Sequence, residues 1–199
     1  MIIDPASFPA ASAYKILIGS IVPRPIGFVS TISAEGVFNL APFSFFNAMC
    51  GEPPVVGFCP GNRNPPLDTL ANVRATGEFV VNIATEDIAE AMNLSAGDYA
   101  PSVDEFTVSG LTPAPCEVVR PPRVLESPVN MECKLLQIIE LSARPLGASL
   151  VLGEVVRFHL DKTIIDDRFR IDPDRLRAVG RMGGTAYCRT RDRFEMIRP

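Results

Sequence analysis

The sequence has few of the residues from which metal sites and thiol sites are built. It contains a single histidine, His159, so a zinc site with the usual histidine and cysteine ligands is hard to assemble. The cysteines form no Cys-x-x-Cys pair and their number is odd; they are Cys50, Cys59, Cys116, Cys133 and Cys188. The sequence therefore predicts no metal site, no disulfide framework and no thiol redox motif.

Charge and hydropathy argue against two further classes of partner. A net charge of −4 leaves no basic patch for nucleic acid or for an anionic membrane surface. No run approaches the roughly 18 to 20 consecutive apolar residues of a membrane span. The first ten residues lack the positive segment that precedes the apolar part of a signal peptide. We therefore expect a cytoplasmic protein without nucleic-acid or membrane partners.

Length and proline distribution predict a single domain over residues 1–199. A chain of 199 residues buries a sizeable core without disulfide bonds. The 19 prolines gather between periodic segments, at 53–54, 65–66, 113–115 and 121–122, with no polar tract beside them. They mark connections within one domain rather than a linker between two.

Hydrophobic periodicity predicts mostly strands. Strands are expected over 26–32, 55–58, 79–83, 129–141 and 149–160. The last two should pair antiparallel through a turn near Pro145–Gly147. The alternation over 79–83 predicts a half-buried strand with Asn82 on its polar side. In 129–141, Asn130 and Glu132 are expected on a polar face opposite an apolar one.

The predicted helices are short. They cover 9–19, 68–76, 85–93 and the segment from Asp172 to Gly180. Asp68 is expected as the N-cap of the second helix and Gly77 as its stop, whereas Asp172 and Pro173 start the last one. A capping-box spacing over 102–105 predicts a single turn. Because strands dominate without βαβ alternation, we predict a mainly β fold, an antiparallel barrel with short peripheral helices.

The stretch over 23–58 carries almost no charge and is unusual for a core hairpin. Residues 33–36 predict a turn with positive φ at the glycine. The segment over 39–47, Asn-Leu-Ala-Pro-Phe-Ser-Phe-Phe-Asn, sets amide and hydroxyl groups among aromatic rings, and Pro42 removes a donor that a central strand needs. Such groups suit a flat ligand with a polar edge. Alternatively, this is a strand edge whose polar groups bond to nearby backbone.

Three later segments extend the pattern of 23–58. They read NRNPPLDTLANVRATGEFVVNI over 62–83, MNLSAGDYAPSVDEF over 92–106 and GRMGGTAY over 180–187. In this order the four segments resemble the flavin reductase-like family, the FMN-binding split-barrel proteins, and they cover most of the chain. The resemblance implies an antiparallel Greek-key split barrel, the architecture that periodicity predicts.

The resemblance also implies a bound FMN and a set of residues around it. Hydroxyl, amide and cationic groups for the phosphate are Ser44, Asn47, Thr69 at a helix start, and Arg63. For the ring edge and ribityl chain the candidates are Ser30, Thr31, Asn39 and Ala41, completed by Phe45, Gly183 and Tyr187. Family members often carry lysine before the Asp-Thr pair, where this chain has Leu67, so either the cationic role passes to Arg63 or FMN binds more weakly. A solvated loop charge is the alternative for Arg63, and a tight turn with a core tyrosine is the alternative for the last two residues.

The function implied by the resemblance is hydride transfer from NAD(P)H to flavin, with electrons passed on to a monooxygenase or another acceptor. His159 is a candidate catalytic residue, because a histidine in a comparable strand of such reductases lies near the nicotinamide side; a structural role is the alternative. Two other functions stay open. One is a flavoredoxin-like FMN carrier reduced by a protein partner. The other is a non-redox binding module that has lost the flavin, an option that Leu67 keeps open.

The resemblance further implies a homodimer with flavin near the subunit interface. Phe43, Phe45 and Phe46 lie so close in sequence that alternation can send only some of them into one core. We therefore expect an exposed aromatic face, covered by flavin, by the segment around Tyr187 or by a second subunit.

Overall fold

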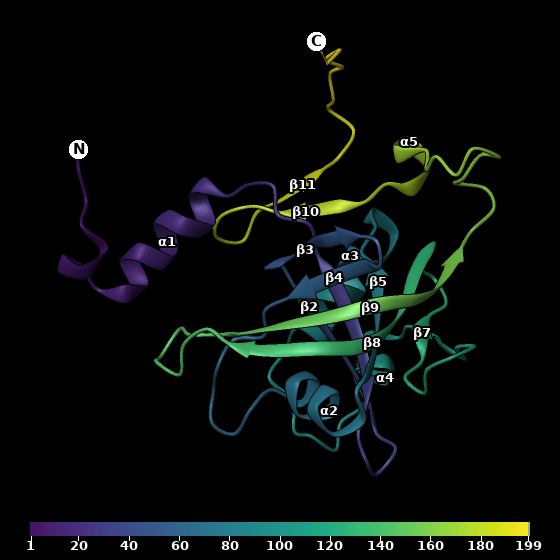
Figure 1. The fold of residues 1–199 in the computed structure, drawn as a ribbon, viewed down its shortest axis with the longest axis horizontal. Coiled ribbons are helices and arrows are strands. Elements are labelled where there is room, and N and C mark those ends of the chain that lie inside the picture. The colour runs from purple at the N-terminus through teal and green to yellow at the C-terminus, as the bar shows by residue number, and fades with distance from the viewer. Residues whose placement is uncertain (199) are drawn as a thin grey trace.

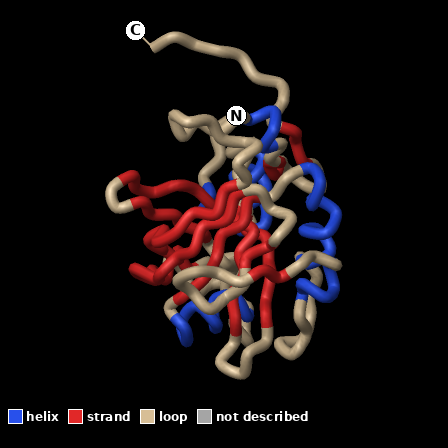
Figure 2. Tube along the Cα trace, turned by 90° about the vertical axis from the view of Figure 1, so that its right-hand side faces the viewer, coloured by secondary structure: helices blue, strands red, loops and turns tan. Residues whose placement is uncertain are grey.

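A seven-stranded antiparallel sheet forms the body of the protein (Figure 1), seen in a computed structural model that describes residues 1–198. Its strand order is β2-β1-β5-β8-β9-β4-β3. The bounds are β1 Gly27–Ile32, β2 Phe38–Phe43, β3 Phe46–Gly51, β4 Pro54–Phe58, β5 Glu78–Ile83, β8 Val129–Glu140 and β9 Ser149–Leu160. The strands curl together in Figure 2, with helices and loops around them. The prediction of a mainly β, antiparallel barrel is confirmed.

The remaining elements are short and surround this sheet. The helices are η1 Pro5–Ser7, α1 Ala10–Ser20, α2 Asp68–Thr76, η2 Glu86–Ile88, α3 Ala89–Ser95, α4 Glu105–Ser109 and α5 Pro173–Leu176. Two small sheets pair β6 Pro113–Ala114 with β7 Arg123–Val124, and β10 Val179–Arg181 with β11 Tyr187–Arg189. Within residues 1–198, none of the helices combines the length and the apolar character needed to cross a membrane.

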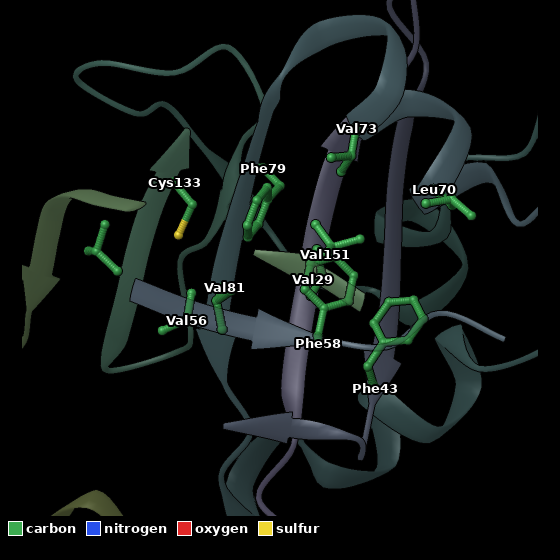
Figure 3. Close-up of a cluster of buried hydrophobic side chains, with 11 residues drawn as sticks. Val29, Phe43, Val56, Phe58, Leu70, Val73, Phe79, Val81, Cys133 and Val151 are labelled. Carbon is green, nitrogen blue, oxygen red and sulfur yellow. The ribbon is translucent and has the colours of Figure 1, made fainter. Parts of the chain in front are cut away.

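Phenylalanine side chains fill the interior of the barrel. The Phe58 ring centre lies 5.0 Å from that of Phe43 and 5.3 Å from that of Phe79, at the centre of the cluster drawn in Figure 3. A second apolar cluster includes Leu40 of β2 and Phe106 of α4. Strand β2 is therefore anchored by buried side chains from both clusters, although it ends the sheet.

The prediction of an exposed aromatic face is wrong. Phe43 is buried in the barrel core, and Phe46 packs against the same cluster. Phe45 is half-buried, and its ring centre lies 6.4 Å from that of Tyr14 in α1. The alternation fails because the chain turns between β2 and β3 at residues 44–45, so Phe43 and Phe46 both point inward from different strands.

Several local predictions are confirmed. Gly36 has φ +89° in the hairpin turn, and Gly77 ends α2 with φ +69°. β8 and β9 pair antiparallel over nearly their whole length. Pro42 lies in an edge strand, where no ladder hydrogen bond is lost on the outer side.

The predicted polar positions at Asn82 of β5 and at Asn130 and Glu132 of β8 are wrong, because these side chains are buried, whereas Lys134 and Glu140 farther along β8 are exposed as expected. Asn82, Asn130 and Glu132 are almost completely shielded from solvent. The connection that contains β6 and β7 covers them and satisfies their hydrogen bonds: Val124 N donates to Asn82 Oδ1 at 2.9 Å, and Asn130 Nδ2 donates to Val124 O at 3.0 Å. A connection that is distant in sequence therefore buries side chains that the polar–apolar alternation predicts to face solvent.

Three helix boundaries also differ from the prediction. α5 ends at Leu176 rather than Gly180, because Arg177 adopts φ +52° and Gly180 pairs with Cys188 in the small sheet. Asp68 is the first residue of α2 and caps nothing with its side chain. At α4 the capping carboxylate is that of Asp104, which accepts from Phe106 N at 2.8 Å and lies two residues after the expected cap Ser102.

Candidate functional site

Two hollows lie end to end along the edge strand β2. The first, of about 200 Å³, is lined by residues that include Asn39, Ala41, Arg63 and Thr69. The second, of about 260 Å³, is lined by residues that include Ser44, Arg24, Arg181 and Tyr187. Pro42 and Ala96 line both hollows, so together they make one groove, called here the β2 groove.

A buried hydrogen-bond network forms the floor of the first hollow. The side-chain oxygen of Asn39 accepts from Thr69 Oγ1 at 2.7 Å and from Thr31 Oγ1 at 3.1 Å. The Asn39 amide donates to Glu105 Oε2 at 3.1 Å, and Asn72 Nδ2 donates to Thr31 Oγ1 at 3.0 Å. Because each partner is itself fixed, the Asn39 amide is held in one orientation. β1, β2, α2 and α4 each contribute to this floor.

Acidic side chains dominate the first hollow. Asp68, Asp98 and Glu105 line it together with Arg63, whose Nη1 lies 2.5 Å from Asp98 Oδ1. Burial raises the pKa of the Asp68 carboxyl, and burial likewise raises the pKa of Glu105. With its cation already paired, this hollow suits neutral polar groups better than a phosphate.

The second hollow contains a buried arginine held by backbone carbonyls. Arg24 is 5% exposed, and its Nη1 donates to Ile18 O at 2.5 Å and to Ile21 O at 2.8 Å. Its Nη2 donates to Met182 O at 2.9 Å, and its Nε lies 3.5 Å from Ser44 Oγ. The guanidinium therefore ties the end of α1 and the β10–β11 connection to the turn that carries Ser44.

A second cation lies in the same hollow. The Arg181 guanidinium carbon is 4.4 Å from the centre of the Tyr187 ring, and its Nη2 donates to Gly184 O at 2.6 Å. The Tyr187 hydroxyl lies 3.5 Å from Asn93 Oδ1. No aspartate or glutamate is among the described residues that line this hollow. The β2 groove thus has a cationic end and an acidic, amide-lined end.

The β2 groove brings together half of the residues predicted from the sequence. Those that line it are Asn39, Ala41, Ser44, Arg63, Thr69 and Tyr187. Thr31 lies beneath it in the network described above.

The other predicted cofactor residues lie elsewhere. Ser30 is buried and donates to Pro122 O at 2.5 Å. Asn47 is exposed, and its Oδ1 accepts from Ala48 N at 2.9 Å. Phe45 packs near α1, and Gly183 lies against the same helix, where an added Cβ would come within 3.6 Å of Gly19 Cα.

His159 belongs to a separate cluster. The side-chain ligand atoms of Cys116, Glu132 and His159 all lie within 4.8 Å of one another, and His159 Nε2 is 2.6 Å from Glu132 Oε1. The Glu132 carboxylate already accepts three backbone N–H groups from 117–119, and burial raises the pKa of Cys116 to about 12. These contacts give the histidine a structural partner away from the β2 groove.

Sequence reasoning missed Arg24 as a site residue. The available signal was a lone cation, flanked by Pro23 and Pro25, at the head of an almost uncharged stretch. Its partner Met182 is 158 residues away along the chain, so no local pattern links the two.

Comparison with known proteins identifies the class. The model of the flavin reductase-like domain matches residues 18–172, and the chain belongs to this family. An uncharacterized protein of Aquifex aeolicus is 40% identical over 178 residues, 88% of this chain and 89% of that one.

Two solved structures share the fold along nearly their whole length. Nitrilotriacetate monooxygenase component B from Bacillus cereus superposes with a TM-score of 0.95 at 34% identity, covering 98% of each chain. The 2-nitrobenzoate 2-nitroreductase NbaA of Pseudomonas fluorescens gives a TM-score of 0.91 at 34% identity, covering 100% of this chain and 96% of that one. The chain is thus a flavin reductase-like split-barrel protein.

Proposed function

We propose that this chain is an FMN-dependent flavin reductase that takes a hydride from NAD(P)H and passes electrons to an acceptor. The observation that carries the proposal is Arg24. Its guanidinium is buried beside the Ser44 hydroxyl, in a hollow whose described lining contains no carboxylate. A buried cation without a countercharge is costly, and a phosphate group would supply that charge with matching geometry.

The charge distribution orients the flavin in this proposal. Ser44 and Arg24 would hold the phosphate, and Asn39 and Ala41 would lie beside the ring. The Asn39 amide, fixed by Glu105 and Thr69, then offers a positioned hydrogen-bonding group to the polar edge of the ring. Bound flavin supplies the hydride-accepting ring, and the protein supplies binding, orientation and polarity.

Two predicted residues have a reduced part in this proposal. Arg63, expected to replace the missing lysine at Leu67, already pairs with Asp98 in the acidic hollow. His159 lies against Glu132 rather than in the β2 groove, so no step of hydride transfer is assigned to it.

An oxygenase is the proposed class of electron acceptor. The Bacillus cereus neighbour is the B component of a nitrilotriacetate monooxygenase, at 34% identity over 98% of this chain. That likeness supports a role as the reducing half of a two-component system. The substrate of the oxygenase half is determined by a different protein.

An absorbance spectrum of the purified protein with FMN tests the reaction. On anaerobic addition of NADH or NADPH, the flavin band near 450 nm should bleach without any second protein. Bleaching that requires a protein donor would identify a flavoredoxin-like carrier instead. A protein that does not bind added FMN would be a non-redox binding module and would overturn the proposal.

Substitution of Ser44 tests where the phosphate lies. Ser44→Ala removes one charge-assisted hydrogen bond, so FMN affinity should fall by about 1.5–3 kcal/mol, or roughly 10- to 150-fold. Affinity for riboflavin, which lacks the phosphate, should not change. Fluorescence-quenching titrations measure both, and Ser102→Ala, at an exposed serine outside the groove, is the matched control. If Ser44→Ala binds FMN like the parent, the phosphate is not at this end.

A further inference from the structure

A large apolar hollow lies on the other side of the segment that carries Arg24. Its volume is about 710 Å³, within the range of about 300–1,000 Å³ that is typical of small-molecule sites. The ends of β5, β8 and β9 line it, together with the loop over 161–172, α5 and β10. Arg24 and Ile26 line both this apolar hollow and the second hollow of the β2 groove. The segment over 23–26 is therefore a wall between the two.

The lining of the apolar hollow defines the chemistry of a ligand. Within residues 1–198, every side chain that lines it is apolar except those of Arg24 and Thr190. The Arg24 guanidinium already donates to three backbone carbonyls, and the Thr190 hydroxyl donates to Ala178 O at 3.0 Å. A charged ligand would lose its hydration here without gaining a partner. The apolar hollow therefore suits a neutral molecule.

A phenylalanine beside the apolar hollow is held in a backbone conformation that bulky residues rarely adopt. Phe169 has φ +59° and is 86% exposed. It is the last residue of the loop over 167–169, which closes where Asp166 N donates to Arg170 O at 3.1 Å. The Asp166 carboxylate fixes this loop by accepting from Arg168 N and Arg170 N, each at 2.9 Å. Loops of this kind usually have glycine at the positive-φ position. Because backbone strain gathers at functional sites, the ring of Phe169 points to a role at this hollow.

The end of the chain leaves the apolar hollow open. Arg193 Nη2 lies 2.7 Å from Asp174 Oδ2 in α5, and Arg191 Nη2 lies 2.7 Å from Glu86 Oε2. Beyond these two ion pairs the chain leads away from the barrel (Figure 1). Two aromatic rings of the lining are thus left uncovered, since Phe158 is 51% exposed and Phe169 is 86% exposed.

We propose that the apolar hollow is a separate ligand site, which binds a neutral organic molecule built of aromatic rings. The Phe158 and Phe169 rings offer such a ligand stacked or edge-to-face contacts. The uncharged lining selects against carboxylates, phosphates and amines. This site lies outside the β2 groove and does not depend on flavin binding. A ligand in it contacts the segment over 23–26, which holds the arginine of the second hollow.

A matched pair of fluorescent probes tests the chemistry of the site. Anilinonaphthalene is neutral and aromatic, and anilinonaphthalene sulfonate adds one negative charge to the same rings. Titration of the purified protein should show saturable binding of the neutral probe, at least about tenfold tighter than binding of the sulfonate. Equal affinity for the two probes, or no saturable binding of the neutral one, overturns the proposal.

Phe169→Gly separates ligand binding from folding. Glycine adopts a positive φ without strain, so the variant should be as stable as the parent. The neutral probe should bind about tenfold more weakly, because an aromatic surface is lost. Leu146→Gly is the matched control, since Leu146 has φ +64°, is 59% exposed and lies in the turn between β8 and β9, outside the apolar hollow. A Phe169→Gly variant that binds the probe as tightly as Leu146→Gly overturns the proposal. If Phe169→Gly unfolds, Phe158→Lys decides instead.

Two further measurements distinguish a small-molecule site from a surface that protein covers. Truncation after Arg191 should leave the affinity for the neutral probe unchanged, and a tenfold gain would mean that the end of the chain fills the apolar hollow. The affinity should also not vary with protein concentration, because a loss at high concentration would mean that a second copy fills it. Either of these results overturns the proposal. Ser44→Ala should bind the probe like the parent, so failure of this site and failure of the proposed flavin site are distinguishable.

Discussion

Replacing Glu132 by glutamine should reveal how the connection over 113–127 is held on the barrel. The Glu132 side chain is fully buried in β8. Its Oε1 accepts from Glu117 N at 2.8 Å, and its Oε2 accepts from Val118 N at 2.6 Å and Val119 N at 2.9 Å. His159 Nε2 lies 2.6 Å from Oε1. A glutamine side chain has nearly the same volume as glutamate, but its amide N–H₂ group would face backbone N–H donors and could not accept from them.

The cost follows from the donors left without an acceptor. Each buried N–H that loses its acceptor costs about 1–3 kcal/mol, and each hydrogen bond to a charged acceptor is worth about 1.5–3 kcal/mol. Because three backbone N–H groups depend on this carboxylate, we expect Glu132→Gln to lower the free energy of unfolding by about 3–5 kcal/mol. For a chain of this size the melting temperature should fall by about 6–20 °C.

The effect should depend on pH in one direction. Burial alone raises the pKa of Glu132, but the three backbone N–H groups and His159 outweigh it and hold the pKa below its ordinary value. A depressed pKa means that the carboxylate contributes its full stability above the unfolded pKa of about 4.3. That contribution is lost as pH falls through the lower folded pKa. The gap between parent and variant should therefore narrow below about pH 4.

Urea unfolding followed by circular dichroism, at pH 7 and at pH 3, measures both quantities. Glu140→Gln is the matched control, because Glu140 lies at the exposed end of the same strand. A loss below about 1 kcal/mol at pH 7, or a gap that is the same at pH 3, would refute the role assigned to the carboxylate.

Two further substitutions address the groove and the barrel. Arg63→Ala should lower the affinity for FMN less than Ser44→Ala does, because the Arg63 guanidinium is already paired with Asp98. The affinity for riboflavin, which lacks the phosphate, is the control. If Arg63→Ala lowers FMN affinity more than Ser44→Ala and leaves riboflavin affinity unchanged, the phosphate lies in the first hollow. Gly153→Ala should lower stability by about 1–3 kcal/mol by overpacking, because an added Cβ would collide with the Phe79 ring in the core. Thermal unfolding measures this loss, with Gly51→Ala as the control, since nothing lies within 4 Å of the corresponding Cβ. Equal melting temperatures for the two glycine variants would contradict the packing described for the core.

The sequence was sufficient for the architecture because strand alternation and glycine stops are local. Gly77 ended a helix and β8 paired with β9 as expected, since each depends on neighbouring residues. The burial of Asn82 and Glu132 was not predictable from the alternation of polar and apolar residues alone, because a connection distant in sequence supplies their hydrogen-bond partners. The same limit applies to helix α5, whose end is fixed by pairing between β10 and β11.

The candidate site was only partly predictable for a related reason. Asn39, Ala41 and Ser44, predicted together from the segment over 39–47, all line the groove because they belong to one strand and its turn. Asn47 follows that turn and leaves the groove with β3. Arg24 is held in the groove by the carbonyl groups of nearby Ile18 and of Met182, 158 residues away, and no spacing in the sequence reveals the second contact.

The order of strands in the sheet has a consequence for synthesis of the chain on the ribosome. β2 and β3 are consecutive in sequence but lie at opposite ends of the sheet, and β3 pairs with β4, which in turn pairs with β9. The second hollow also requires Arg181 and Tyr187 from the last part of the chain. Because such long-range pairing forms late, the groove cannot be complete until nearly the whole polypeptide has emerged. Uptake of a ligand in this groove is therefore a post-translational event rather than one that guides early folding.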